Sequence, residues 1–296
     1  MKKSTKFFVI GGLICLLTGL AIMLITGLAG GVGMMQEIAT NYKFGRVRLV
    51  SYGETAEIED GDFARFSGMK EISVSENQIT SVKIVADEGE IEILQGNGDC
   101  IGISAGSYGV DYAVSDGRLV IRNESDWIFD GEEIIVYLPR DMTFELVELS
   151  VGGGEIDADY LDADQISVKV GGGEVSIERL NAKELDANVG AGEISVERGY
   201  VEGDVMIDVG VGEASFGGFA GGSASLQCGM GELSFYGENM EQTAYNYEMS
   251  CGAGEIRLNG SSYSGVGLHK RIDNGASRSV DIDCGMGEIE VSLSAF

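Results

Sequence analysis

The sequence has very little proline and positive charge for its length. One proline stands against 46 glycines in 296 residues, which excludes a collagen-like chain, and a hydrophobic content of 44% excludes an intrinsically disordered one. Only 20 lysines and arginines face 48 acidic residues, so the net charge is −28. Such a chain would repel nucleic acid and anionic lipid headgroups. Cations, cationic peptides and basic proteins are therefore its plausible electrostatic partners.

The sequence also lacks the usual patterns of catalytic and zinc sites. His269 is the single histidine, so a Ser-His-acid triad would need this residue as its base, and no Gly-x-Ser-x-Gly motif occurs. No Cys-x-x-Cys or His-x-x-x-His spacing indicates zinc. Acidic residues occupy outward strand positions throughout, so no carboxylate pair stands out as a catalytic dyad. We therefore expect a protein that is not an enzyme and has no cofactor.

A long stretch without charge lies near the N-terminus, at residues 7–28. Its 22 residues would form a helix long enough to cross a hydrocarbon core of about 30 Å. Lys2, Lys3 and Lys6 precede it, which predicts a cytoplasmic N-terminus and a single-pass protein of the cell membrane. The predicted organisation is a cytoplasmic tail (1–6), a transmembrane helix in the lipid bilayer (7–28), a spacer (29–70) and an extracytoplasmic β-repeat domain (71–296).

A short motif, [Val/Cys]-Gly-x-Gly-Glu followed by alternating apolar residues, recurs along the second half of the chain. Its glutamates are spaced by 19, 19, 20, 19, 23 and 33 residues, and a weaker copy ends at Glu90. The two longer spacings predict loops pushed out near 237–243 and 261–279. A period of this length indicates an array in which stacked units share a core. The motif glutamates are Glu155, Glu174, Glu193, Glu213, Glu232, Glu255 and Glu288.

The alternation of apolar residues slips by one position inside each motif. Val280, Ile282 and Cys284 alternate with polar residues before the glycines, and Ile289 and Val291 do so after them, but counting by twos does not join the two sets. Side chains on a strand alternate strictly between faces, so the slip indicates a bend. Glycine can supply positive φ at such a bend and lets neighbouring backbones pass closely.

These features predict an all-β fold, a parallel β-solenoid of about 19-residue repeats with glycine corners, after one N-terminal transmembrane helix. A β-sandwich of repeated hairpins is the alternative, because a glycine corner can also be a hairpin turn. One inward position would form a buried ladder in which cysteine replaces valine as an apolar filler without disulfides. This ladder would run through Val151, Val170, Val189, Val209, Cys228, Cys251 and Cys284.

The chain resembles a bacterial family of putative adhesins with β-strand repeats, a domain of unknown function. The resemblance is carried by Asp116–Ser125, by Ile134–Ala158 with the sole proline, Pro139, and by the tandem motif copies, and it covers residues 80–296. It implies a β-helix-like extracytoplasmic domain with no established catalytic residues. The corner here uses glutamate where the family more commonly has Gly-Ser-Gly-Asp, so no ligand specificity is carried over.

The expected function is that of a non-catalytic, membrane-anchored surface or envelope scaffold with an acidic face, an adhesin or binding protein. Its partner would be a surface protein, a glycan or a cationic ligand. An envelope sensor that binds a cationic ligand together with a membrane partner is one alternative, and a carbohydrate-active enzyme is another. If the corners stack, the seven motif glutamates form one carboxylate column, which is the candidate site. We expect a solvated ridge there, with weak calcium binding at most.

Overall fold

The computed structural model describes residues 63–123 and 134–295, all of which fall within one unit, Ile58–Phe296. These residues form a single sheet of 21 strands. Their only helical elements are α3 (Val74–Asn77) and the 3₁₀ turn η2 (Gln242–Ala244). The described part of the chain is thus all-β, as the period-2 alternation of its apolar residues predicts.

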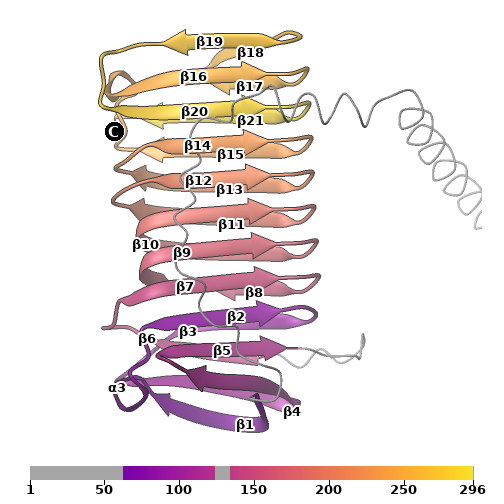
Figure 1. Cartoon of the computed structure of the whole chain (residues 1–296), viewed down its shortest axis with the longest axis vertical. Coiled ribbons are helices and arrows are strands. Elements are labelled where there is room, and N and C mark those ends of the chain that lie inside the picture. The colour runs from indigo at the N-terminus through magenta and orange to yellow at the C-terminus, as the bar shows by residue number, and fades with distance from the viewer. Residues whose placement is uncertain (1–62, 124–133, 296) are drawn as a thin grey trace, which may run out of the picture. The chain divides into compact units, whose positions relative to one another are not determined.

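Two strands joined by one Gly-x-Gly turn form a rung, and successive rungs stack in register (Figure 1). Glu174 pairs with Glu193 in parallel orientation, one 19-residue repeat apart. The strands of a rung hydrogen-bond to neighbouring rungs and not to each other: β8 pairs with β3 and β10. The central strands are β7 (Phe144–Val151), β8 (Glu155–Ala158), β9 (Leu161–Val170), β10 (Glu174–Val189), β11 (Glu193–Val201), β12 (Val205–Val209), β13 (Glu213–Ala220), β14 (Ala224–Cys228) and β15 (Glu232–Glu238).

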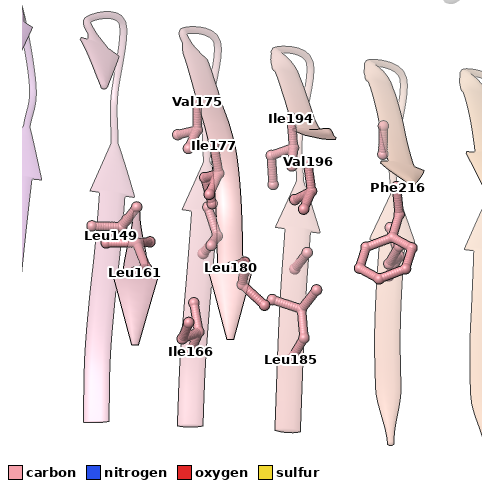
Figure 2. Close-up of a cluster of buried hydrophobic side chains, with 14 of the residues drawn as sticks. Leu149, Leu161, Ile166, Val175, Ile177, Leu180, Leu185, Ile194, Val196 and Phe216 are labelled. Carbon is pink, nitrogen blue, oxygen red and sulfur yellow. The ribbon is translucent and has the colours of Figure 1, made fainter. Parts of the chain in front are cut away.

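The core lies between the two strand layers of the rungs (Figure 2). Leu149 and Ile166 lie on strands that precede a turn, Val175 and Ile194 lie on strands that follow one, and all four are almost fully buried. Each inward side chain also stacks on its equivalent one rung away, as the rings of Phe216 and Phe235 do. Because a single rung would leave its inward side chains open to water on either side, stacking is what buries them.

The N-terminal end of the sheet is mixed. The long strand β4 pairs antiparallel with β1, β5 and β6. β5 and β6 then pair in parallel with β2 and β3, which join the central rungs through β7 and β8. β1 crosses the domain boundary predicted at residue 70, and the other predicted boundaries stay predictions. The strands are β1 (Ala64–Ser73), β2 (Ser81–Ala86), β3 (Glu90–Gly96), β4 (Cys100–Ser115), β5 (Arg118–Asn123) and β6 (Ile134–Pro139).

At the C-terminal end the rungs do not follow sequence order. The rung of β20 and β21 lies between the rung of β14 and β15 and the rung of β16 and β17. The segment predicted as a loop near 261–279 instead contains two strands, β18 and β19, which pair antiparallel with β17 and β16. This extra length lets the chain reach the outer rung first and then return. The strands are β16 (Tyr245–Cys251), β17 (Glu255–Leu258), β18 (Ser261–Ser264), β19 (Leu268–Ile272), β20 (Arg278–Cys284) and β21 (Glu288–Ser294).

The predicted fold class needs correction. Parallel pairing between neighbouring repeats is present, but a parallel β-solenoid as the class of the whole domain is wrong, because the sheet is mixed and its strand order is not sequential at either end. The β-sandwich of hairpins is wrong as well, because no ladder joins the two strands of a motif repeat in the described residues. Antiparallel strands flank the stack at both ends, where the open edges of a parallel stack would otherwise begin.

The predicted membrane segment at residues 7–28, with its cytoplasmic tail, lies outside the described residues, as does the spacer up to residue 62. Within residues 63–123 and 134–295, no helix has the length and apolar character needed to cross a membrane. The predicted cell-membrane localisation is corrected accordingly, because the described residues supply no spanning helix for it.

Candidate functional site

The Gly-x-Gly turns stack along one edge of the rungs (Figure 1). The motif glutamates directly follow these turns and pair in register from rung to rung, so they form one column. Each pairs in register with the glutamate of the next rung, as Glu155 does with Glu174. All seven predicted residues belong to the column, and Glu90 from the weaker copy adds an eighth by pairing with Glu155. The order along the column is Glu90, Glu155, Glu174, Glu193, Glu213, Glu232, Glu288 and Glu255.

Close stacking of the turns explains the glycines on both sides of each turn. A Cβ on Gly173 would lie 2.0 Å from the carbonyl oxygen of Gly154 and 2.5 Å from a methyl of Val151. A Cβ on Gly171 would lie 3.0 Å from the carbonyl oxygen of Gly152. None of the motif glycines in the copies from 152 to 287 has φ in the left-handed region. Of the two reasons that the sequence offers for glycine, the close approach of backbones therefore applies here.

The middle residue of each turn, here called the turn-tip residue, points into open space. The nearest atom to a Cβ on Gly172 would be 3.9 Å away, so the turn has room for a side chain at this position. The side chains of Val211, Met230 and Met286 are 57%, 56% and 62% exposed. An apolar side chain at these positions is therefore not part of the core.

An open groove of about 1170 Å³ runs along the turns. It is lined by motif glycines, by turn-tip residues and by the glutamates of the column from Glu90 to Glu288. We name it the acidic groove. Its polar lining is carboxylate, and its apolar lining comes from the turn tips, so it presents negative charge beside exposed methyl and thioether groups.

Two glutamates of the column, Glu155 and Glu193, have raised pKa values. Burial raises the pKa of Glu155, and nearby carboxylates, among them Glu174 and Glu90, raise it further. Burial also raises the pKa of Glu193, with added contributions from Glu174 and Glu213. In both cases the ionised form is disfavoured by like charges one rung away. A bound cation would relieve this repulsion.

The outer end of the column is neutralised within the chain. Arg257 forms ion pairs with Glu288 and, at 3.1 Å, with Glu255. The hydroxyl of Ser262 donates a hydrogen bond to Glu255 at 2.6 Å, and this bond and Arg257 hold the pKa of Glu255 below its ordinary value. Among the described residues, no basic side chain makes an ion pair with the remaining six glutamates.

Sequence reasoning missed a column of serines beside the glutamates. Ser176, Ser195, Ser215 and Ser234 pair in register, two residues after the glutamate of each rung. The Ser215 hydroxyl donates to the Ser195 hydroxyl at 3.1 Å. The signal was present, because each of these copies reads Gly-Glu-apolar-Ser. These hydroxyls extend the polar surface next to the groove with hydrogen-bond donors and acceptors.

The other candidate chemistry lies outside the groove. His269 on β19 faces Ser250 on β16, with 3.2 Å between Nδ1 and the hydroxyl, and its Nε2 is 3.8 Å from Glu248. The histidine side chain is 63% exposed, and these three residues do not line the groove. In the described parts of the chain, no group of three or more His, Cys, Asp or Glu side chains is arranged to hold a metal ion.

The predicted inward ladder is buried, and its three cysteines are free. Its order differs from the prediction, since Cys284 lies between Cys228 and Cys251. Burial raises the pKa of Cys284 to about 12, with Cys251 and Cys228 adding to the rise. The thiol donates to the carbonyl of Gly287 at 3.1 Å. Burial raises the pKa of Cys228 as well, so the thiols of Cys228 and Cys284 are protonated core groups.

Comparison with known proteins gives a family and several similar folds. A model of the Toastrack DUF4097 family matches residues 115–270, more than half of the chain. A putative lipid binding protein from Parabacteroides distasonis is 15% identical, with a TM-score of 0.46 over 78% of this chain and 98% of that one. A putative adhesin from the same species is 14% identical, with a TM-score of 0.42 over 78% and 97%. A putative cell adhesion protein from Clostridium sporogenes is 14% identical, with a TM-score of 0.34 over 78% and 100%.

No curated protein matches the chain. The match to the Toastrack DUF4097 family confirms the family resemblance that the tandem motifs suggest.

Proposed function

The chain belongs to the Toastrack DUF4097 family, and we propose that it is a non-catalytic binding scaffold of the adhesin type whose acidic groove takes a cationic ligand. The observation that supports this most directly is the run of six glutamates, Glu90 to Glu232, that face one another on successive rungs without an ion-pair partner among the described residues. Rungs of a parallel stack lie about 4.8 Å apart, so the carboxylates form a dense line of negative charge.

The fold suits a scaffold because it fixes the backbone of these glutamates from both sides. Turn backbones hydrogen-bond from rung to rung, as the Glu174 amide does to the Gly154 carbonyl at 3.0 Å and the Glu193 amide to the Gly173 carbonyl at 2.9 Å. Each glutamate is then followed by a buried apolar residue, such as Val175 or Ile194. A cationic ligand would therefore meet a row of carboxylates whose backbone positions are set before it binds, so no rearrangement of the backbone would oppose binding.

Fluorescence anisotropy of labelled oligolysine, titrated with the full-length protein at increasing sodium chloride, tests this proposal. We expect binding that weakens steeply with salt, because exposed charges are screened over a Debye length of about 10 Å at 0.1 M. A neutral peptide of the same length, rich in glutamine and serine, is the control and should not bind. Absence of oligolysine binding at low salt, or binding that salt does not change, would reject the proposed function.

A further inference from the structure

The turn-tip residues change character along the acidic groove. The inner turns carry Gly153 and Gly172, which have no side chain, whereas the outer turns carry Val211, Met230 and Met286. These three are among the seven large hydrophobic side chains that are exposed in the described residues. The groove therefore has an inner part that offers charge alone and an outer part that offers charge and apolar surface.

The apolar side chains of the outer part belong to consecutive rungs. The Met230 amide donates to the Gly210 carbonyl at 2.8 Å, and the Met286 amide donates to the Gly229 carbonyl at 2.7 Å, so each turn tip lies directly beside the next. At about 4.8 Å per rung, three such side chains form a continuous patch. An exposed apolar patch of this kind is typical of an interaction surface, and methionine adapts well to varied partners.

We propose that the groove binds an extended polypeptide segment with basic and apolar side chains, its apolar part over Val211, Met230 and Met286 and its basic part along the glutamates of the inner turns. This inference rests on the proposed function and names the class of ligand. Charge complementarity selects the occupant: lysine and arginine side chains match the carboxylates, and their aliphatic stems and neighbouring apolar residues match the patch. A second copy of this chain is a poor occupant, because its net charge is also −28.

The orientation along the groove follows from the same two features. Arg257 neutralises Glu288 at the outer end, so positive charge on the ligand gains less there than at Glu155 or Glu174. The inner turns, in contrast, offer no side chain to an apolar residue. The groove thus favours positive charge at its inner turns and apolar groups at its outer turns. A linear segment can contact both parts at once, whereas a single metal ion cannot.

The test compares two labelled peptides on the full-length protein: oligolysine, and a peptide of equal charge with leucine residues added at one end. We expect the mixed peptide to bind about tenfold more tightly. The double variant Met230→Ser and Met286→Ser should reduce the affinity of the mixed peptide about tenfold and should weaken oligolysine binding much less, because oligolysine binds chiefly through the carboxylates. Met69→Ser, at an exposed methionine on β1 that lies outside the groove, is the matched control and should change neither.

A photoreactive group placed at the apolar end of the mixed peptide tests the orientation. It should cross-link to the segment around Val211, Met230 and Met286, and not to the turns at Gly153 and Gly172. Equal affinity of the two peptides, or no effect of the methionine variants, would overturn this inference while oligolysine binding left the proposed function standing. Cross-linking to the inner turns would overturn the orientation.

Discussion

Cys228 and Cys284 are paired in register on neighbouring rungs, although 56 residues separate them in the chain. Cys251 is only 23 residues from Cys228, yet it lies one rung further out, beyond Cys284. This arrangement follows from the insertion of the β20–β21 rung between two rungs that precede it in sequence. The spatial order of the buried thiols, Cys228, Cys284 and Cys251, is therefore the same as the order of the rungs.

These three thiols should be free in the purified protein, and among them forced oxidation should give only bridges that contain Cys284. Adjacent rungs, about 4.8 Å apart, fall within the Cα separation of 4.4–6.8 Å that a disulfide allows, whereas two rungs do not. Peptide mapping by mass spectrometry under non-reducing conditions, with and without an oxidant, checks both statements. A bridge between Cys228 and Cys251 would contradict the rung order, and a bridge in untreated protein would contradict the role of apolar filler.

Alanine substitution should destabilise the protein at a turn glycine that contacts the neighbouring turn but not at a turn-tip glycine. In Gly173→Ala the new methyl would overlap the carbonyl of Gly154, and we expect a loss of about 1–3 kcal/mol or more in the free energy of unfolding. Gly172→Ala on the neighbouring residue places its methyl in open space and should change stability little. Urea denaturation followed by circular dichroism measures both. Equal effects of the two variants would argue against close stacking of the turns.

Stability should rise as the pH falls from 7 toward 4.5. The pKa values of Glu155 and Glu193 are raised above 4.5 in the folded protein, as those of Asp208 and Asp283 are above 3.8, in each case chiefly by burial. A carboxyl with a raised folded pKa contributes stability that is present below its unfolded pKa and lost as the pH rises through the folded pKa. Glu255, whose pKa is lowered, opposes this trend.

Urea midpoints measured across this pH range check the pH dependence. Glu193→Gln should be more stable than the wild type at pH 7 and should show a weaker pH dependence, because it removes one of the crowded charges. Stability that falls steadily from pH 7 downward would contradict the crowding of the column.

Calcium should stabilise the protein no more than sodium chloride of the same ionic strength. The described residues contain no group of three or more ligands arranged for a metal, and the column offers one carboxylate per rung. Thermal melting of the full-length protein in the two salts measures the difference. A shift specific to calcium that disappears in the triple variant Glu174→Gln, Glu193→Gln and Glu213→Gln would instead show a metal site.

The sequence predicts the parts of the fold that depend on one repeat and its neighbour. The 19-residue spacing places Glu174 beside Glu193, and the slip of alternation at each turn places Val170 in the core. Both follow from strand periodicity, which is a local property. The same reasoning could have found the serine column, since Ser176 and Ser195 share the spacing of the glutamates.

The order of the last rungs could not be predicted in this way. The copies around Cys251 and Cys284 both read Cys-Gly-x-Gly-Glu, so each could stack on the rung of Cys228 equally well by local pattern. The choice depends on how the segment between them folds, and β18 and β19 pair back onto β16 and β17. For the acidic groove, the sequence likewise predicts only the column of charge. The apolar surface beside it could not be predicted, because the exposure of Met230 depends on which side of the turn faces solvent.

The most direct test of the central claim, that the glutamate column binds a cationic partner, is the affinity of oligolysine for two variants of equal charge. One carries Glu174→Gln, Glu193→Gln and Glu213→Gln within the groove, and the other carries Glu197→Gln, Glu202→Gln and Glu238→Gln at exposed positions outside it. The groove variant should bind at least about tenfold more weakly than the wild type at low salt, and the control variant should bind within about twofold of it. Equal loss in both variants would mean that net charge alone attracts the peptide and would contradict a binding site in the groove.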